Sequence, residues 1–152
     1  MLTGAAVTQR PELMAAAIVA VPLLDMLRYQ HFLMARYCVP EYGSAENPAQ
    51  FGYLRAYSSY HNVRAGTADP AALLTAGEND SRVHPLHARK VAAALQAATV
   101  SDPQQKTALL TVNRDVGYGP GKPLARGGAT PPTRCYSWPA SSAWRLSRPR
   151  CL

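Results

Sequence analysis

A ten-residue apolar stretch, AAAIVAVPLL at residues 15–24, constrains the fold more than any other part of this chain. It shows no alternation of polar and apolar residues, which is typical of a strand covered on both faces, as in a parallel sheet. A helix needs about 20 apolar residues to cross a bilayer, and this stretch is too short. The sequence therefore predicts a buried strand here and no membrane-spanning segment.

Strands and helices are predicted to alternate along the rest of the chain. Two further short apolar segments, 71–76 and 108–112, predict strands, and apolar spacing predicts helices at 3–10, 25–37, 50–57 and 86–98. This order indicates an α/β fold with a mostly parallel sheet. Three strands form only part of such a sheet, and nothing before residue 15 can flank the first strand. We therefore expect a partial domain.

The composition changes at about residue 124. Residues 1–123 hold eleven Lys/Arg and nine Asp/Glu, whereas residues 124–152 hold five Arg and no acid, so much of the net charge of +7 belongs to the tail. The tail shows no hydrophobic period and is expected to be disordered. Trp138 and Trp144 with nearby Arg could bind single-stranded nucleic acid, but an unstructured tail is the favoured interpretation. The predicted division is residues 1–123 and 124–152.

The cysteine and histidine spacings match no metal or redox motif. Cys38, Cys135 and Cys151 fit neither a zinc pattern nor a Cys-x-x-Cys pair, which favours a reduced cytoplasmic setting. His84 and His87 could share a metal at the start of a helix, but no third ligand is near, so a solvated helix start is favoured. We expect no metal site and no cofactor.

Residues 73–86, LLTAGENDSRVHPL, contain the best local signal for chemistry. A buried strand ends in a polar turn there, and function in open α/β sheets gathers at the carboxyl ends of strands. Asp80 is placed to orient a histidine, and Arg82 to reach a substrate carbonyl or carboxylate. The alternative is that Asp80 caps the following helix. The spacing alone leaves both interpretations open.

Four stretches together resemble the prolyl oligopeptidase family of serine peptidases. DSRVHPLH at 80–87 is close to the aspartate-bearing Asp-x-Arg-Val-x-Pro-Leu-His turn of that family. VPLLDMLRY at 21–29 resembles the strand and loop after its nucleophile. YSSYHNV at 57–63 resembles its Tyr-Ser-Pro-x-His-Asn segment, with Ser59 where Pro is usual, and GYGPGKP at 117–123 resembles its Gly-His-Gly-x-Gly-Lys-Pro loop. The resemblance covers roughly residues 1–123.

The resemblance implies a partial α/β-hydrolase fold and hydrolysis of short peptides after proline by a Ser-His-Asp triad. By position, Asp80 is the triad acid and Arg82 binds a substrate carbonyl. The family's catalytic His falls at Tyr118, and a phenol with a pKa near 10 is a poor general base. Leu23, Met34, Tyr42 and Val83 would line the proline pocket, with Cys38 where the family has a Trp that stacks on proline.

The resemblance also implies that this chain is a fragment. The nucleophile of the family lies in a Gly-x-Ser-x-Gly elbow, expected a few residues before the stretch 2–5 and therefore outside this chain. We expect the chain to be inactive alone, and proline-containing peptides to be ligands of the intact family. An alternative is a non-catalytic fragment that complements an upstream peptidase segment. The expected location is the cytoplasm, and the periplasm is the alternative location for the parent enzyme.

Overall fold

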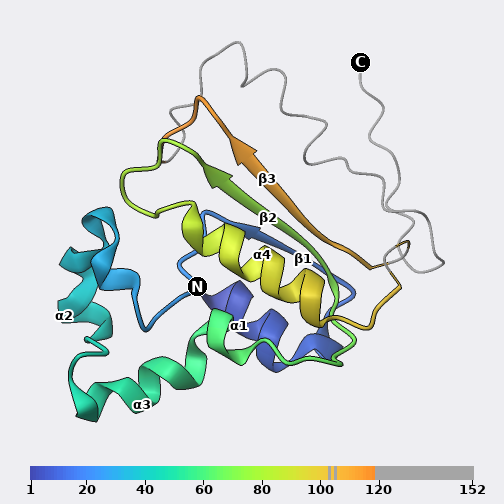
Figure 1. The fold of residues 1–152 in the computed structure, drawn as a ribbon, viewed down its shortest axis with the longest axis horizontal. Coiled ribbons are helices and arrows are strands. Elements are labelled where there is room, and N and C mark those ends of the chain that lie inside the picture. Colours follow the sequence, from blue (N-terminus) through green and yellow to red (C-terminus); the bar gives the residue numbers. More distant parts are fainter. Residues whose placement is uncertain (103, 105, 119–152) are drawn as a thin grey trace. The chain divides into compact units, whose positions relative to one another are not determined.

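The protein contains a three-stranded parallel sheet. The computed structural model describes residues 1–102, 104 and 106–118, which belong to one compact unit, Met1–Lys122. The strands are β1 (Ala16–Ala20), β2 (Ala71–Gly77) and β3 (Ala108–Asn113), in the spatial order β1-β2-β3 (Figure 1). Both strand pairs are parallel. The predicted α/β class and parallel sheet are confirmed.

In the part of the chain that the structure describes, four α-helices and four short 3₁₀ helices connect and cover the strands. The α-helices are α1 (Leu2–Gln9), α2 (Val39–Tyr42), α3 (Pro48–Tyr57) and α4 (Leu86–Ala98). The 3₁₀ helices are η1 (Pro11–Leu13), η2 (Tyr29–His31), η3 (Leu33–Cys38) and η4 (Ser59–Asn62). Helix α3 begins where Pro at its first position and the Asn47 side chain, which accepts the Ala49 N–H at 3.0 Å, satisfy its N-terminus.

The main core lies between one face of the sheet and the helices α1 and α4. Helix α4 lies in front of the sheet in Figure 1. Ala17 and Val19 of β1 and Leu74 of β2 pack in one cluster with Val7 of α1 and Leu95 of α4. The central strand β2 is almost completely buried, because it has a strand on each side. Burial on this scale makes the end of β2 a rigid platform for the turn that follows it.

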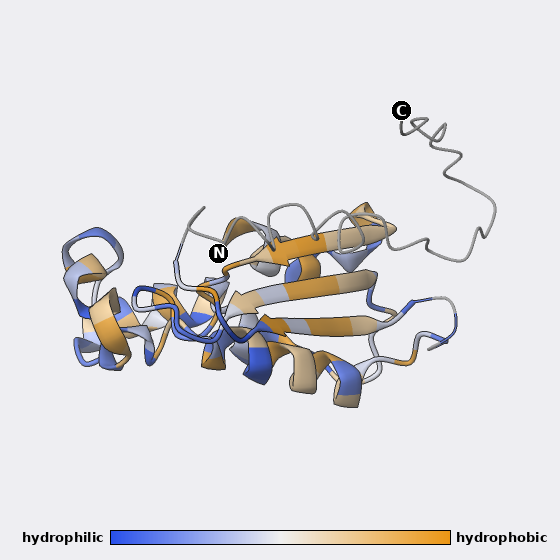
Figure 2. Cartoon of the chain, turned by 90° about the horizontal axis from the view of Figure 1, so that it is seen from above, coloured by the Kyte–Doolittle hydropathy of each residue, from blue (hydrophilic) through white to orange (hydrophobic). Residues whose placement is uncertain are grey.

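Strand β1 differs from its prediction in length and burial. It ends at Ala20, and alternate residues are exposed, with Ile18 57% exposed. The expectation of burial on both faces is wrong for this chain, because Ala17 and Val19 pack into the core on one face while the residues on the other face, Ile18 among them, are exposed. Val21, at a φ of 46°, and Pro22 then end the strand. Figure 2 shows hydrophobic colouring along most of each strand, β1 included.

The predicted helix at 25–37 is also wrong. The segment forms the two 3₁₀ helices η2 and η3, separated at Phe32, and Leu33 has a φ of 51°. Of the four residues that carry the helical spacing, Met26 and Tyr29 are buried in a second core cluster, whereas Leu33 and Tyr37 are exposed. The spacing therefore does not mark one continuous buried face of this segment.

Two further sequence predictions concern membrane-spanning segments and the C-terminal tail. Among the described residues, no helix is both long enough and apolar enough to span a lipid bilayer. The predicted disorder of residues 124–152, with the alternative of nucleic-acid binding through Trp138 and Trp144, lies outside the described residues. The boundary between residues 123 and 124 stays a prediction.

Candidate functional site

The Asp80 carboxylate occupies the turn after β2 and has two unequal oxygens. Its Oδ1 accepts the backbone N–H groups of Arg82 and Val83, both at 2.8 Å. Its Oδ2 is buried and has no hydrogen-bond partner among the described residues. The side chain is only 3% exposed. One oxygen is therefore fixed by the turn, while the other is left with unused capacity to accept a hydrogen bond.

Asp80 does not cap helix α4. The N-cap of α4 is Pro85, and the side chain that accepts a hydrogen bond from the first turn is that of His84, whose Nδ1 accepts the Leu86 N–H at 3.0 Å. The Asp80 side chain instead closes its own turn through the N–H groups two and three residues ahead, as Asp side chains commonly do. The helix-cap alternative from the sequence is therefore wrong.

The loop after β3 is tied to the Asp80 turn by backbone contacts. Glu78 N–H donates to the Asn113 carbonyl at 2.9 Å, and Asn79 N–H donates to the Val116 carbonyl at 3.2 Å. The Asn79 side chain adds a bond to the Arg114 carbonyl at 2.8 Å. A Cβ at Gly77 would come within 2.4 Å of the Val116 carbonyl oxygen, so glycine permits this close approach.

This close approach brings Tyr118 next to Arg82. The Arg82 guanidinium carbon lies 4.9 Å from the centre of the Tyr118 ring, within the range of a cation–π interaction. The Tyr118 side chain is 49% exposed, so the pair lies at the surface beside the buried Asp80. The structure thus brings together the three residues that the sequence placed at the catalytic end of the sheet.

The residues expected to line a proline pocket fall into two groups. Leu23, Cys38 and Tyr42 pack together against the cluster formed by Met26 and Tyr29. Val83 is half-buried within the Asp80 turn, and Met34 is 51% exposed. The structure therefore unites three of the five residues. Their role in binding stays a prediction.

Tyr29 holds that apolar cluster in place. Its hydroxyl donates to the Gly43 carbonyl at 2.5 Å, and its ring meets Tyr42 edge-on with the ring centres 5.9 Å apart. Burial raises the pKa of Tyr29 to about 12, so the phenol stays neutral at physiological pH. Gly43 has a φ of 91°, in the left-handed region that glycine adopts at little cost. The cluster thus has a hydrogen-bonded polar centre within an apolar shell.

A family model for the prolyl oligopeptidase family matches residues 1–131. The chain belongs to the prolyl oligopeptidase family. The prolyl endopeptidase of Elizabethkingia miricola is 37% identical over 123 residues, which are 80% of this chain and 17% of that protein. The prolyl endopeptidase of Dictyostelium discoideum is 33% identical over 127 residues, 83% of this chain and 17% of that protein.

Solved structures of the prolyl oligopeptidase family show the same arrangement. A chain from a study of two prolyl endopeptidases superposes with a TM-score of 0.74 at 50% identity, covering 78% of this chain and 17% of that one. Prolyl oligopeptidase B from Galerina marginata, bound to a 25mer macrocyclization substrate, gives 0.75 at 29% identity, covering 83% and 18%. The parallel sheet and its helices match the family's α/β-hydrolase domain, and the chain spans about 17% of the curated relatives' length.

Within this family fold, His87 is not the solvated residue that its sequence position suggested. It is 1% exposed, and its Nδ1 accepts the Asp25 backbone N–H at 3.2 Å. Burial lowers the pKa of His87 to about 4. His84 uses its own Nδ1 to accept the Leu86 N–H at 3.0 Å. The solvated-start interpretation is therefore wrong for His87, and among the described residues no metal-holding group of three His, Cys, Asp or Glu exists.

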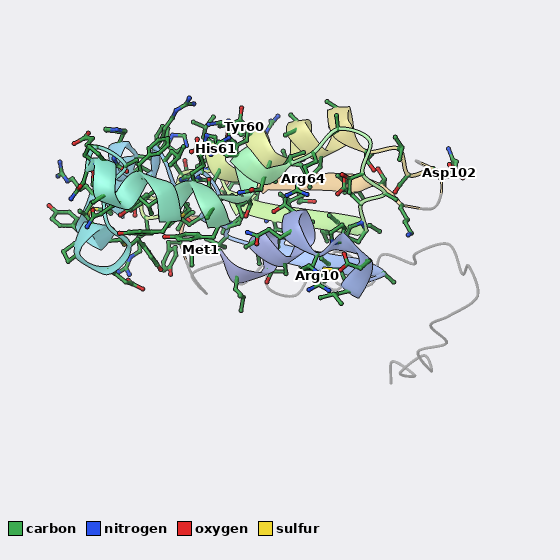
Figure 3. The ribbon with its side chains drawn as sticks, turned by 90° about the horizontal axis from the view of Figure 1, so that it is seen from below. Met1, Arg10, Tyr60, His61, Arg64 and Asp102 are labelled. Carbon is green, nitrogen blue, oxygen red and sulfur yellow. The ribbon has the colours of Figure 1, made fainter. Side chains whose placement is uncertain are left out.

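A buried charge cluster around Asp25 was missed by the sequence analysis. Asp25 has a side chain 1% exposed; it pairs with Lys90, and its Oδ1 lies 3.8 Å from His61 Nδ1. Ser58 Oγ lies 2.8 Å from the same His61 nitrogen. Figure 3 shows His61 beside Tyr60, whose ring centre is 4.0 Å from Lys90 Nζ.

The Asp25 cluster joins three segments of the prolyl oligopeptidase fold that are distant in sequence. Asp25 follows β1, His61 belongs to η4, and Lys90 belongs to α4. Burial lowers the pKa of His61, which opposes the effect of the neighbouring Asp25 carboxylate. One signal of this cluster is visible in the sequence: Asp25 follows a predicted strand, as Asp80 does. The sequence does not reveal His61 and Lys90 as partners of Asp25, because only the fold brings these distant residues together.

Proposed function

We propose that this chain is the acid-bearing part of a serine peptidase domain that cleaves peptides after proline, and that it does not hydrolyse peptides by itself. In the Ser-His-Asp mechanism, the serine attacks the carbonyl, the histidine transfers the proton, and the aspartate orients the histidine. Asp80 fills the last role. Membership of the prolyl oligopeptidase family supports this assignment.

The single observation that carries the proposal is the unused Asp80 Oδ2. A triad aspartate must be fixed in position and still accept the N–H of a histidine. Asp80 meets both needs, because Oδ1 is held by two backbone N–H groups and Oδ2 is buried without a partner among the described residues. Asp25 and Asp69 each also have one buried oxygen without a hydrogen-bond partner among the described residues, and Asp80 differs from them in its position after β2 beside Arg82 and Tyr118.

Three departures from the family pattern support inactivity of the chain alone. The 152 residues contain no Gly-x-Ser-x-Gly sequence, so no nucleophile elbow is present in them. Tyr118 stands where the catalytic histidine is expected, and Cys38 stands where a Trp would stack on the substrate proline. Loss of triad members lowers the rate by many orders of magnitude.

The decisive experiment supplies the missing parts. The chain would be co-expressed with a family segment that carries the Gly-x-Ser-x-Gly elbow, and hydrolysis of a chromogenic Gly-Pro peptide measured. We expect no turnover for the chain alone or for the complex, and turnover for the complex carrying Tyr118→His. Tyr118→Phe is the matched control. Activity in the His variant that survives Asp80→Ala would refute the assigned role of Asp80.

A second candidate function is that of a non-catalytic fragment that pairs with an upstream peptidase segment. The edge position of β1, with Ile18 57% exposed, favours it, because an unpaired strand edge is a template for another strand. Co-purification with the elbow-bearing segment tests it. We expect Ile18→Lys to abolish pairing and Leu13→Lys, at an exposed residue outside the sheet, to leave it intact. Equal effects of the two substitutions would contradict pairing through β1.

A further inference from the structure

A surface hollow of about 670 Å³ lies next to the Asp80 turn, and of its lining residues only Met34 has been given a role so far, in the predicted proline pocket. Its lining residues come from η2, η3 and the turn itself: Gln30, His31, Leu33, Met34, Arg36 and Ser81. Ser81 directly follows Asp80 in the chain. Any ligand in the hollow would therefore lie next to the candidate catalytic acid.

The backbone of η3 turns apolar side chains toward this hollow. Phe32 anchors the segment, since its ring centre lies 5.6 Å from the ring centres of both His84 and His87. Leu33 follows at a φ of 51°, a strained conformation for a branched side chain, and is 47% exposed. Met34 is 51% exposed. Strained backbone that exposes apolar side chains at a concave site is typical of binding surfaces.

One of the residues that line the hollow, Arg36, carries a positive charge. None of its six lining residues is acidic, and no described carboxylate forms an ion pair with Arg36. Arg36 instead lies over the Tyr37 ring, with its guanidinium carbon 5.1 Å from the ring centre. His31 faces Glu46 at 3.6 Å. One guanidinium nitrogen of Arg36 donates to the Tyr37 hydroxyl at 3.4 Å, and its other N–H groups are donors of the kind that bind carboxylates.

We propose that this hollow binds a carboxylate carried by a peptide ligand. Arg36 binds the carboxylate, and Leu33 and Met34 contact the neighbouring apolar part of the peptide. The carboxylate can be an acidic side chain or the C-terminus, which share the same chemistry. This inference rests on the proposed function in one respect, that the ligand is a peptide. It adds that peptides with a carboxylate beside the proline site are preferred.

The test is binding of labelled pentapeptides to the full chain, followed by fluorescence anisotropy. Four peptides share a Gly-Pro core: one has a free C-terminus, one an amidated C-terminus, and two amidated peptides carry Glu or Gln beside the core. We expect the free acid or the Glu peptide to bind about three- to five-fold more tightly than its uncharged counterpart. Which of the two is favoured identifies the source of the carboxylate.

Two variants separate this inference from the proposed function. Arg36→Gln should remove the preference for the carboxylate, whereas Arg64→Gln, the same charge change at an exposed residue outside the hollow, should retain it. Equal binding of charged and uncharged peptides, or equal losses in both variants, would overturn the inference. Replacing Pro by Ala in each peptide and Arg82 by Ala in the protein tests the proposed function independently. A preference for the carboxylate that persists without any preference for proline would contradict the proposed function and leave the inference about the hollow intact.

Discussion

The guanidinium carbon of Arg82 lies 4.9 Å from the centre of the Tyr118 ring. In the prolyl oligopeptidase pattern, these positions belong to a substrate-binding arginine and to the catalytic histidine. The contact therefore joins two groups that would each face a substrate. Under the proposed assignment, Tyr118 stands in place of the general base, and its ring contacts the arginine.

A double-mutant cycle on this pair is the first prediction. Arg82→Gln and Tyr118→Leu each remove the cation–π contact, and we expect a coupling free energy of about 0.5 kcal/mol, because the pair is half exposed. Urea denaturation of the four proteins measures it. Additive effects of the two substitutions would show that the contact contributes nothing to stability in solution.

The second prediction concerns the Asp80 carboxylate. Asp80→Ala should lower the free energy of unfolding by about 2 kcal/mol, since two backbone N–H groups lose a charged acceptor. Asp80→Asn keeps an oxygen for those two donors and should cost about 1 kcal/mol or less. Urea denaturation distinguishes the two variants. Equal losses would mean that the turn does not depend on the bonds to Oδ1.

Gly77 provides the third prediction, because it controls how closely the Tyr118 loop approaches the Asp80 turn. Gly77→Ala places a Cβ 2.4 Å from the Val116 carbonyl oxygen, a backbone atom that cannot move away cheaply, and should cost about 2–3 kcal/mol. The control is Gly52→Ala in helix α3, which meets open space and should stabilise by about 0.5–1 kcal/mol. Thermal unfolding measures both variants. A lower unfolding temperature for Gly77→Ala together with a higher one for Gly52→Ala would confirm the packing argument.

The sequence predicted the parts of the fold that depend on local pattern. Helix α4 (Leu86–Ala98) lies where its amphipathic spacing placed it, and β2 and β3 lie within one or two residues of their predicted bounds. The Asp80 turn was recognisable because its chemistry is contained in one short segment, from Gly77 to Val83. Each of these features is decided by neighbours in sequence.

The features that the sequence did not predict depend on contacts between distant segments. The position of His87 at the start of a helix predicts exposure, yet the side chain is 1% exposed and its ring accepts the Asp25 backbone N–H. Residues 25–37 have helical spacing, but the anchoring of Phe32 on α4 breaks them into two short turns. Tertiary packing overrides local preference in both cases.

The buried His87 leads to the last prediction, a loss of stability in mild acid. Its pKa is about 4 in the folded protein, against an ordinary value of 6.5, because burial disfavours the charged ring. Between these two values the unfolded chain binds a proton that the folded chain does not, so stability falls as the pH falls. Nearby charged groups are Asp25, which favours the charged ring, and Lys90 and His84, which oppose it.

Urea denaturation between pH 7.5 and pH 5 measures this effect. Burial raises the pKa of Asp69, and a raised carboxyl pKa changes stability in the opposite direction to His87 as the pH falls. The free energy of unfolding should be constant above about pH 7 and about 2 kcal/mol lower at pH 5 through His87 alone. His61, whose pKa burial also lowers, adds to the loss in the same direction. His87→Asn, which keeps an acceptor for the Asp25 N–H, should flatten the profile, and His31→Gln, at an exposed histidine, should not. An unchanged slope in His87→Asn would show that the buried ring is not the group that titrates.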